Sequence, residues 1–224
     1  MHIALLALCC GLKYTCALRV FAFGDSLTAG MVDRATYSPY GASLQQFLPE
    51  GSIVESSGVV LESSHAMPTR LARELSAHEE AFDIILILGG SNDLWRGDHN
   101  AIMSSLDLLY KQVHHAGAAL GVATLPPFEP DIMRWLSFTG VLAQTESTRV
   151  AVNERIRDMA ASADGHVDPA CGAFLVDLAR LCEQEPQTMA RPDGLHFTAE
   201  GYQRLGEEAA AALLAALPSE KILC

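Results

Sequence analysis

The sequence has few basic residues. Its 224 residues include 15 Lys and Arg against 27 Asp and Glu, which gives a formal net charge of −12 and a pI near 5.0. It also lacks any run of Lys or Arg that would reverse this charge locally. A surface of this sign repels phosphate backbones and anionic lipid head groups. The composition therefore argues against a nucleic acid as partner.

The sequence also lacks the patterns of metal ligands. No pair of its six cysteines has the spacing of a zinc site, and no Asn-x-Ser/Thr acceptor for glycosylation occurs. A bridge between Cys171 and Cys182 and a pair of free thiols are both compatible with the sequence, so the redox compartment stays open. We predict no metal and no cofactor.

The sequence lacks an apolar run long enough to span a bilayer, and one of its longer runs lies near the N-terminus, at residues 3–12. This run is too short to span a bilayer, which argues against stable membrane insertion, but it has the length of a signal-peptide core. No Lys or Arg precedes it, and the small residues Cys16 and Ala17 make a mediocre cleavage site. Residues 1–17 are therefore either a signal peptide or a disordered N-terminal segment, and both a secreted and a cytoplasmic location are compatible with the sequence.

Half of the residues are apolar, which is enough for the core of one domain, and we place it at residues 18–218 with a C-terminal tail at 219–224. Strand-like apolar runs alternate with helical patterns, as in an α/β protein whose parallel sheet is covered on both faces. The predicted strands are 18–23, 52–55, 83–88, 121–125 and 173–177. The predicted helices are 39–47, 67–78, 101–116, 145–163 and 199–217.

Ligands of such open sheets bind beyond the carboxyl ends of the strands. The run 84–88 has no polar alternation, so it predicts a central strand buried on both faces. Gly24-Asp25-Ser26 follows the first predicted strand, and Gly89-Gly90-Ser91-Asn92-Asp93 follows the third. These two turns are where we expect the site.

Ser26 becomes a nucleophile only if a base takes its proton. Asp193 and His196 lie three residues apart before the last helix, so the acid can orient the imidazole while the other ring nitrogen faces Ser26. The Asn92 side-chain amide and the backbone N–H of Ser26 are candidate donors for an oxyanion hole. Each residue taken alone also has a structural interpretation: Asp25 and Ser26 as a helix cap, His196 as a surface histidine, Asn92 as a turn residue.

Three blocks together resemble the GDSL, or SGNH, esterases and lipases: Gly24-Asp25-Ser26-Leu27-Thr28, Gly90-Ser91-Asn92-Asp93 and Asp193-Gly194-Leu195-His196-Phe197-Thr198. The resemblance covers residues 20–200. It implies a three-layer α/β/α sandwich with a flavodoxin-like five-stranded parallel sheet of order 2-1-3-4-5. It further implies a serine esterase acting on small-molecule carboxylic esters of arylesterase, lysophospholipase or carbohydrate-ester type. Ser26, Asp193 and His196 would be the catalytic residues, and Ser26 and Asn92 would stabilise the oxyanion.

The second block of the family matches only loosely, over residues 55–63. The family places an oxyanion glycine before an acid; alignment on the acid Glu62 puts Leu61 at that position, whereas alignment on the glycine puts Gly58 there. The donor is a backbone N–H, so Leu61 serves if its backbone conformation is one that a non-glycine residue adopts. We favour Leu61.

Two other functions are compatible with these residues. An acyltransferase or thioesterase would use the same site with a different acyl acceptor or donor, and a catalytically silent binding domain would use the same fold. Phe128, Met133, Trp135 and Phe138 either line an acyl pocket or pack within a long loop. Oligomeric state is not indicated by the sequence.

Overall fold

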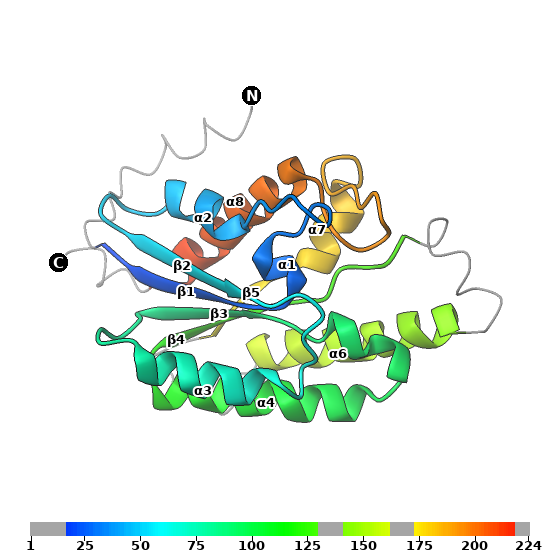
Figure 1. Ribbon diagram of the computed structural model, residues 1–224, viewed down its shortest axis with the longest axis horizontal. Helices are drawn as coiled ribbons and strands as arrows, with labels where there is room; N and C mark the ends of the chain where they lie inside the picture. Colours follow the sequence, from blue (N-terminus) through cyan, green and yellow to red (C-terminus); the bar gives the residue numbers. More distant parts are fainter. Residues whose placement is uncertain (1–16, 130–140, 162–172, 218–224) are drawn as a thin grey trace.

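The computed structural model describes residues 17–129, 141–161 and 173–217, and in them a five-stranded parallel sheet of order β2-β1-β3-β4-β5 (Figure 1). The strands are β1 (Arg19–Gly24), β2 (Ile53–Gly58), β3 (Ile84–Leu88), β4 (Ala119–Ala123) and β5 (Ala173–Val176). In the register of the sheet, Gly24 at the end of β1 lies opposite Gly58 of β2 and Leu88 of β3. The predicted sheet and strand order are confirmed.

Helices cover both faces of the sheet, which gives the predicted three layers (Figure 1). One face carries α1 (Ser26–Ala29), α2 (Tyr40–Gln46), α7 (Leu178–Gln184) and α8 (Ala199–Ala216). The other face carries α3 (Met67–Ala77), α4 (His99–His115) and α6 (Val141–Ala161), and the 3₁₀ helix η1 (Ser91–Arg96) follows β3.

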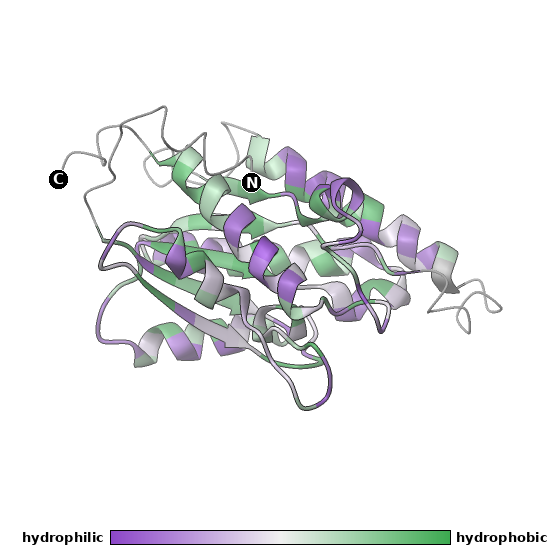
Figure 2. Cartoon of the chain, turned by 90° about the horizontal axis from the view of Figure 1, so that it is seen from above, coloured by the Kyte–Doolittle hydropathy of each residue, from purple (hydrophilic) through white to green (hydrophobic). Residues whose placement is uncertain are grey.

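Burial follows the hydrophobic pattern of the sequence. Every residue of β3 is buried, as expected for a central strand covered on both faces. In Figure 2 the strands in the interior are mostly green, whereas the outer helices alternate between purple and green. The helices thus turn their apolar sides to the sheet and their polar sides outward.

Three short elements differ from the sequence prediction. We predicted no element at α1, η1 or α7, which are four, six and seven residues long. α1 and η1 are too short to show an apolar repeat. α7 does carry apolar residues at helical spacing, Leu178, Leu181 and Cys182, a signal that the sequence prediction did not use. No helix in the described ranges is long and apolar enough to cross a membrane.

Some sequence predictions fall partly outside the described residues. Met133, Trp135 and Phe138 lie there, while Phe128 is buried in the core. Cys171 lies outside as well, and Cys182 is a buried free thiol whose pKa is raised to about 12 by burial. The predicted N-terminal segment, except Ala17, and the tail 219–224 also lie outside the described ranges.

Candidate active site

Ser26 is the first residue of α1, directly after the turn that ends β1. The turn is tight: a Cβ on Gly24 would lie 2.1 Å from the Leu88 carbonyl oxygen, so only glycine fits there. Asp25 caps α1, because its Oδ1 accepts a hydrogen bond from the Leu27 N–H at 3.0 Å. The capping role that the sequence indicated for this acid is therefore present, and the cap turns Ser26 toward the carboxyl ends of the strands.

His196 lies between Ser26 and Asp193. Its Nε2 is 2.8 Å from Ser26 Oγ, and its Nδ1 is 2.6 Å from Asp193 Oδ2. All three residues come from the predicted positions, although 170 residues separate Ser26 from His196. The structure brings the nucleophile, imidazole and acid of the sequence prediction into one hydrogen-bonded series.

The loop before α8 holds the acid and the imidazole in place. Asp193 Oδ1 accepts hydrogen bonds from the backbone N–H groups of Leu195 at 3.0 Å and His196 at 2.7 Å. Gly194 has a φ of 98°, a conformation that favours glycine and allows this tight turn. Thr198 caps α8 by accepting from the Gly201 N–H, which fixes where the loop ends and the helix begins.

Asp193 is held in its charged form. Partial burial acts to raise its pKa, but the hydrogen bonds from His196 and from the two backbone amides outweigh burial and lower it. An ionised carboxylate accepts the Nδ1–H of the imidazole, and in this tautomer of the neutral ring Nε2 is the acceptor that faces the Ser26 hydroxyl. This arrangement suits proton transfer from the serine.

The loop after β2 carries the candidate oxyanion donor. Leu61 has a φ of 63°, and it is the sole non-glycine residue with positive φ in the described ranges. This left-handed conformation costs a non-glycine residue about 1–2 kcal/mol, whereas glycine adopts it readily. Leu61 thus takes up a glycine-like backbone at the position that the alignment on Glu62 assigns to the oxyanion glycine.

Gly58, the alternative position, has a packing role. A Cβ there would lie 2.0 Å from the Ala29 backbone nitrogen and 2.6 Å from the Asp25 carbonyl oxygen. Glycine at 58 therefore lets the end of β2 pack directly against α1. Its neighbour Val59 continues this contact, because the Val59 N–H donates to the Gly24 carbonyl at 3.1 Å.

Asn92 lies beside this loop. Its Nδ2 donates to the Glu62 carbonyl oxygen at 2.9 Å, which uses one of the two amide hydrogens and leaves a second donor. Among the described residues, neither the Ser26 N–H nor the Leu61 N–H donates a hydrogen bond. Three donors of the kind an oxyanion needs therefore follow the neighbouring strands β1, β2 and β3.

Arg70 links these segments, and it was not among the residues predicted from the sequence. Its guanidinium donates to the Gly24 carbonyl at 2.7 Å, to Ser57 Oγ at 2.5 Å and to Glu62 Oε2 at 2.6 Å. The ion pair is buried, with side chains 7% and 8% exposed. A signal was present, because Arg70 lies among Met67, Leu71 and Glu74 at helical spacing, on the buried side of α3.

A group of acids lies behind the turn. Asp25 is fully buried, its Oδ2 has no hydrogen-bond partner among the described residues, and its pKa is raised to about 7 by burial and by the charges of Glu62 and Asp93. Asp93 Oδ2 accepts a hydrogen bond from the Ser64 N–H at 2.6 Å. It thereby links η1 to the loop after β2.

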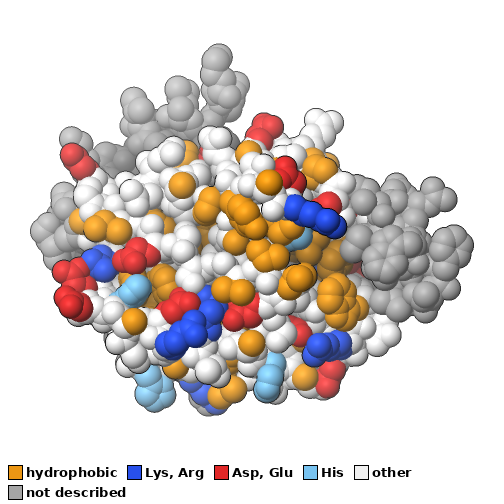
Figure 3. Space-filling view, viewed as in Figure 1, with side chains coloured by type: hydrophobic (Ala, Val, Ile, Leu, Met, Phe, Trp, Pro, Cys, Tyr) orange, Lys and Arg blue, Asp and Glu red, His pale blue; other side chains and the backbone are white. Residues whose placement is uncertain are grey.

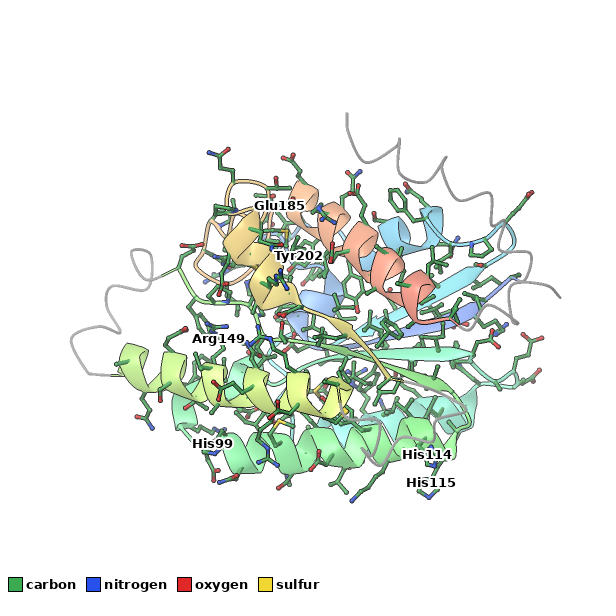
Figure 4. All side chains as sticks on the ribbon, turned by 180° about the vertical axis from the view of Figure 1, so that it is seen from behind. His99, His114, His115, Arg149, Glu185 and Tyr202 are labelled. Atoms are coloured by element: carbon green, nitrogen blue, oxygen red, sulfur yellow. The ribbon has the colours of Figure 1, made fainter. Side chains whose placement is uncertain are left out.

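Three of the other histidines lie on α4. Figure 4 shows His99, His114 and His115 on α4, across the sheet from α8, where Tyr202 is labelled. Tyr202 OH donates to the Met31 carbonyl at 2.9 Å, which links α8 to the loop after α1. No group of three or more His, Cys, Asp or Glu side chains in the described ranges is arranged to hold a metal ion.

A model of a known protein family matches most of the chain. The model of the GDSL-like lipase/acylhydrolase family matches residues 22–204. No curated protein matches the chain significantly.

Solved structures share the fold. A candidate arylesterase from Agrobacterium tumefaciens has a TM-score of 0.66 at 21% identity, covering 89% of this chain and 100% of the other. The lipase/acylhydrolase from Enterococcus faecalis has a TM-score of 0.65 at 20% identity, covering 88% and 96%. A member of the lipolytic G-D-S-L family from Veillonella parvula has a TM-score of 0.63 at 14% identity, covering 88% and 99%.

Proposed function

Because the chain belongs to the GDSL-like lipase/acylhydrolase family of esterase- and lipase-type hydrolases, we propose that it is a serine esterase that cleaves carboxylic esters through an acyl-enzyme intermediate. The observation that carries the proposal is the position of His196, 2.8 Å from Ser26 Oγ and 2.6 Å from Asp193 Oδ2. These distances suit a general base that is oriented by an acid.

In the first step, Ser26 Oγ attacks the ester carbonyl carbon while His196 Nε2 takes the hydroxyl proton. The negative charge that develops on the carbonyl oxygen is stabilised by the Asn92 amide and the backbone N–H groups of Ser26 and Leu61. The bond to the alcohol oxygen then breaks, and the alcohol leaves with the proton from His196. Asp193 stabilises the imidazolium throughout.

In the second step, water attacks the acyl-enzyme. His196 takes a proton from the water, the tetrahedral intermediate collapses, and Ser26 Oγ leaves with the proton returned by Nε2. The products are the carboxylic acid and the free enzyme. No cofactor is needed for either step.

The proposal is tested with p-nitrophenyl acetate and butyrate and with a fluorophosphonate probe. We expect hydrolysis of both esters and labelling of the protein at Ser26. S26A and H196A should each lose about a thousandfold or more in kcat with the fold intact by circular dichroism. D193N should lose about a hundredfold or more, because Asn cannot stabilise the imidazolium.

Asp93 offers a matched control, since it lies next to Asn92 and bonds backbone rather than imidazole. D93N should lower the free energy of unfolding and have only a small effect on kcat. Labelling at another serine, or full activity in H196A, would overturn the proposal. Product analysis with a competing alcohol distinguishes hydrolysis from acyl transfer by the same residues.

A further inference from the structure

Three consecutive aliphatic residues are exposed in the loop after β2. Val59, Val60 and Leu61, here called the aliphatic segment, are 41%, 37% and 76% exposed. Figure 3 shows hydrophobic side chains gathered in the middle of the face viewed in Figure 1. Large apolar side chains in a contiguous exposed run mark a binding surface more often than scattered ones do.

The segment is held from both ends. The Val59 N–H is bonded to the Gly24 carbonyl, two residues before Ser26, and the Glu62 carbonyl is bonded to Asn92. Leu61 lies between these anchors, in a turn that the Glu62 N–H closes by donating to the Val59 carbonyl at 3.2 Å. Its left-handed backbone is a conformation that asparagine or glycine would adopt at lower cost. A strained backbone next to a reactive serine points to a role for the leucine side chain itself.

The proposed mechanism determines which part of the ester lies against the aliphatic segment. The leaving alcohol must take its proton from His196, so the alcohol lies on the side of the loop before α8. The carbonyl oxygen points to the Leu61 N–H and to Asn92. The acyl chain then has to leave the reacting carbon on the side away from His196, which is the side of the loop after β2. In Figure 1 this loop and α8 lie on opposite sides of α1.

We propose that the aliphatic segment binds the acyl chain of the substrate, and that Leu61 makes the enzyme selective for esters of medium-length aliphatic acids over acetate esters. The inference rests on the proposed function. An acetyl group is too short to cover the Leu61 side chain, whereas a chain of about six to eight carbons buries it and gains free energy for each methylene removed from water.

The test measures kcat/KM for p-nitrophenyl acetate, butyrate, hexanoate and octanoate below their solubility limits. We expect kcat/KM to rise from acetate to octanoate in the unmodified protein. In L61N and L61G the octanoate-to-acetate ratio should fall about tenfold, since each methylene in contact with an apolar side chain is worth several-fold. Asparagine and glycine both tolerate the left-handed backbone, so both variants should fold, with L61G at least as stable to urea as the parent.

V60T changes an apolar side chain to a polar one of the same shape and should lower the ratio in the same direction. Leu108 provides the control, because it is an exposed leucine on α4, across the sheet from α1. L108N should leave both the ratio and the activity unchanged.

The outcomes separate the two proposals. If the parent protein hydrolyses acetate and is labelled at Ser26, but L61N and L61G keep its ratio, acyl-chain binding by this segment is wrong and the esterase proposal stands. If the ratio is kept and L61N instead shifts the sedimentation of the protein to a smaller species, the segment is an interface between copies of the chain. If no ester is hydrolysed and Ser26 is not labelled, both proposals fail together.

Discussion

Asp25 stands out at the scale of single residues because it is an acid with almost no exposure to water. Its Oδ1 has one backbone donor, and its Oδ2 has none among the described residues. Burial and the nearby charges of Glu62 and Asp93 raise its pKa from 3.8 to about 7. Near neutral pH this side chain is therefore protonated in part of the molecules, whereas most carboxylates are fully ionised.

The raised pKa predicts how stability depends on pH. Between about pH 4 and pH 7 the folded state retains a proton on Asp25 that the unfolded chain has lost. The contribution of this residue to the free energy of unfolding is therefore fully present below about pH 4 and is lost as the pH rises through about 7. The shift corresponds to a loss of roughly 4 kcal/mol. Urea unfolding of the parent and D25N from pH 5 to pH 8 should show a smaller decline in D25N, whose amide oxygen still accepts from Leu27.

D33N is the control for this comparison. Asp33 is exposed, and hydrogen bonds from the Ala35 and Thr36 amides lower its pKa, so it is already ionised across this range. D33N should keep the slope of the parent. Parallel curves for D25N and the parent would contradict the raised pKa of Asp25.

Arg70 acts at the scale of elements, because one side chain from α3 bonds the end of β1, the end of β2 and the loop that follows β2. The guanidinium also lies over the Phe23 ring, 3.8 Å from its centroid. Such a set of contacts uses the planar fork of arginine, which lysine cannot reproduce. The conformation of the loop that carries Leu61 therefore depends on α3.

R70M should lower the free energy of unfolding by about 3–5 kcal/mol, because it leaves the buried Glu62 carboxylate without its partner. Urea unfolding measures the loss, and R70M/E62Q should recover part of it, since the second change removes the unpaired charge. R73M is the control on the same helix: Arg73 is exposed, so its loss should cost less than about 1 kcal/mol. Equal losses of unfolding free energy in R70M and R73M would exclude a role of Arg70 in linking β1, β2 and the loop after β2.

Close packing between α2 and α8 supplies a second prediction at this scale. A Cβ on Gly206 would lie 2.5 Å from the Tyr40 carbonyl oxygen and 2.7 Å from the Leu44 nitrogen. Alanine favours a helix over glycine by about 1 kcal/mol, but a methyl group pressed against two backbone atoms costs more.

G206A should therefore destabilise the protein by about 1–3 kcal/mol. It should also lower kcat, because α8 begins just after His196 and moves with it. Q203A on the exposed side of α8 should be neutral or slightly stabilising in thermal unfolding. A more stable G206A would mean that the two helices separate without cost.

The sequence predicted those elements that are long and periodic. The unbroken run of β3 and the apolar repeats of α3, α4 and α8 carry their own signals, and the strand order came with the family resemblance. The short helix α1 carries no such repeat, whereas α7 carries one only over its seven residues, through Leu178, Leu181 and Cys182. For the candidate site, motifs predicted Ser26, Asn92, Asp193 and His196, and hydrogen bonds join Ser26, His196 and Asp193 in the structure. The choice between Leu61 and Gly58 stays a prediction; the backbone angle of Leu61 bears on it, and no residue pattern encodes such an angle.

The net charge of −12 acts at the scale of the whole molecule. A negative surface slows the approach of anionic esters and leaves neutral ones unaffected. The ratio of kcat/KM for a p-nitrophenyl hemiester of a dicarboxylic acid to that for the neutral butyrate should therefore rise with NaCl between 10 and 300 mM, as salt screens the repulsion. A ratio that stays constant over this range would show that the net charge does not slow the binding of anionic esters.

The 170-residue separation between Ser26 and His196 also bears on how the protein is made. Synthesis proceeds from the N-terminus, so the ribosome delivers the serine early, when β1 has no completed sheet around it. The imidazole follows only after β5 and α7 have emerged, and α8 must then dock before the loop is fixed. A nascent chain consequently lacks the contact between Ser26 and His196 until α8 has left the exit tunnel and docked.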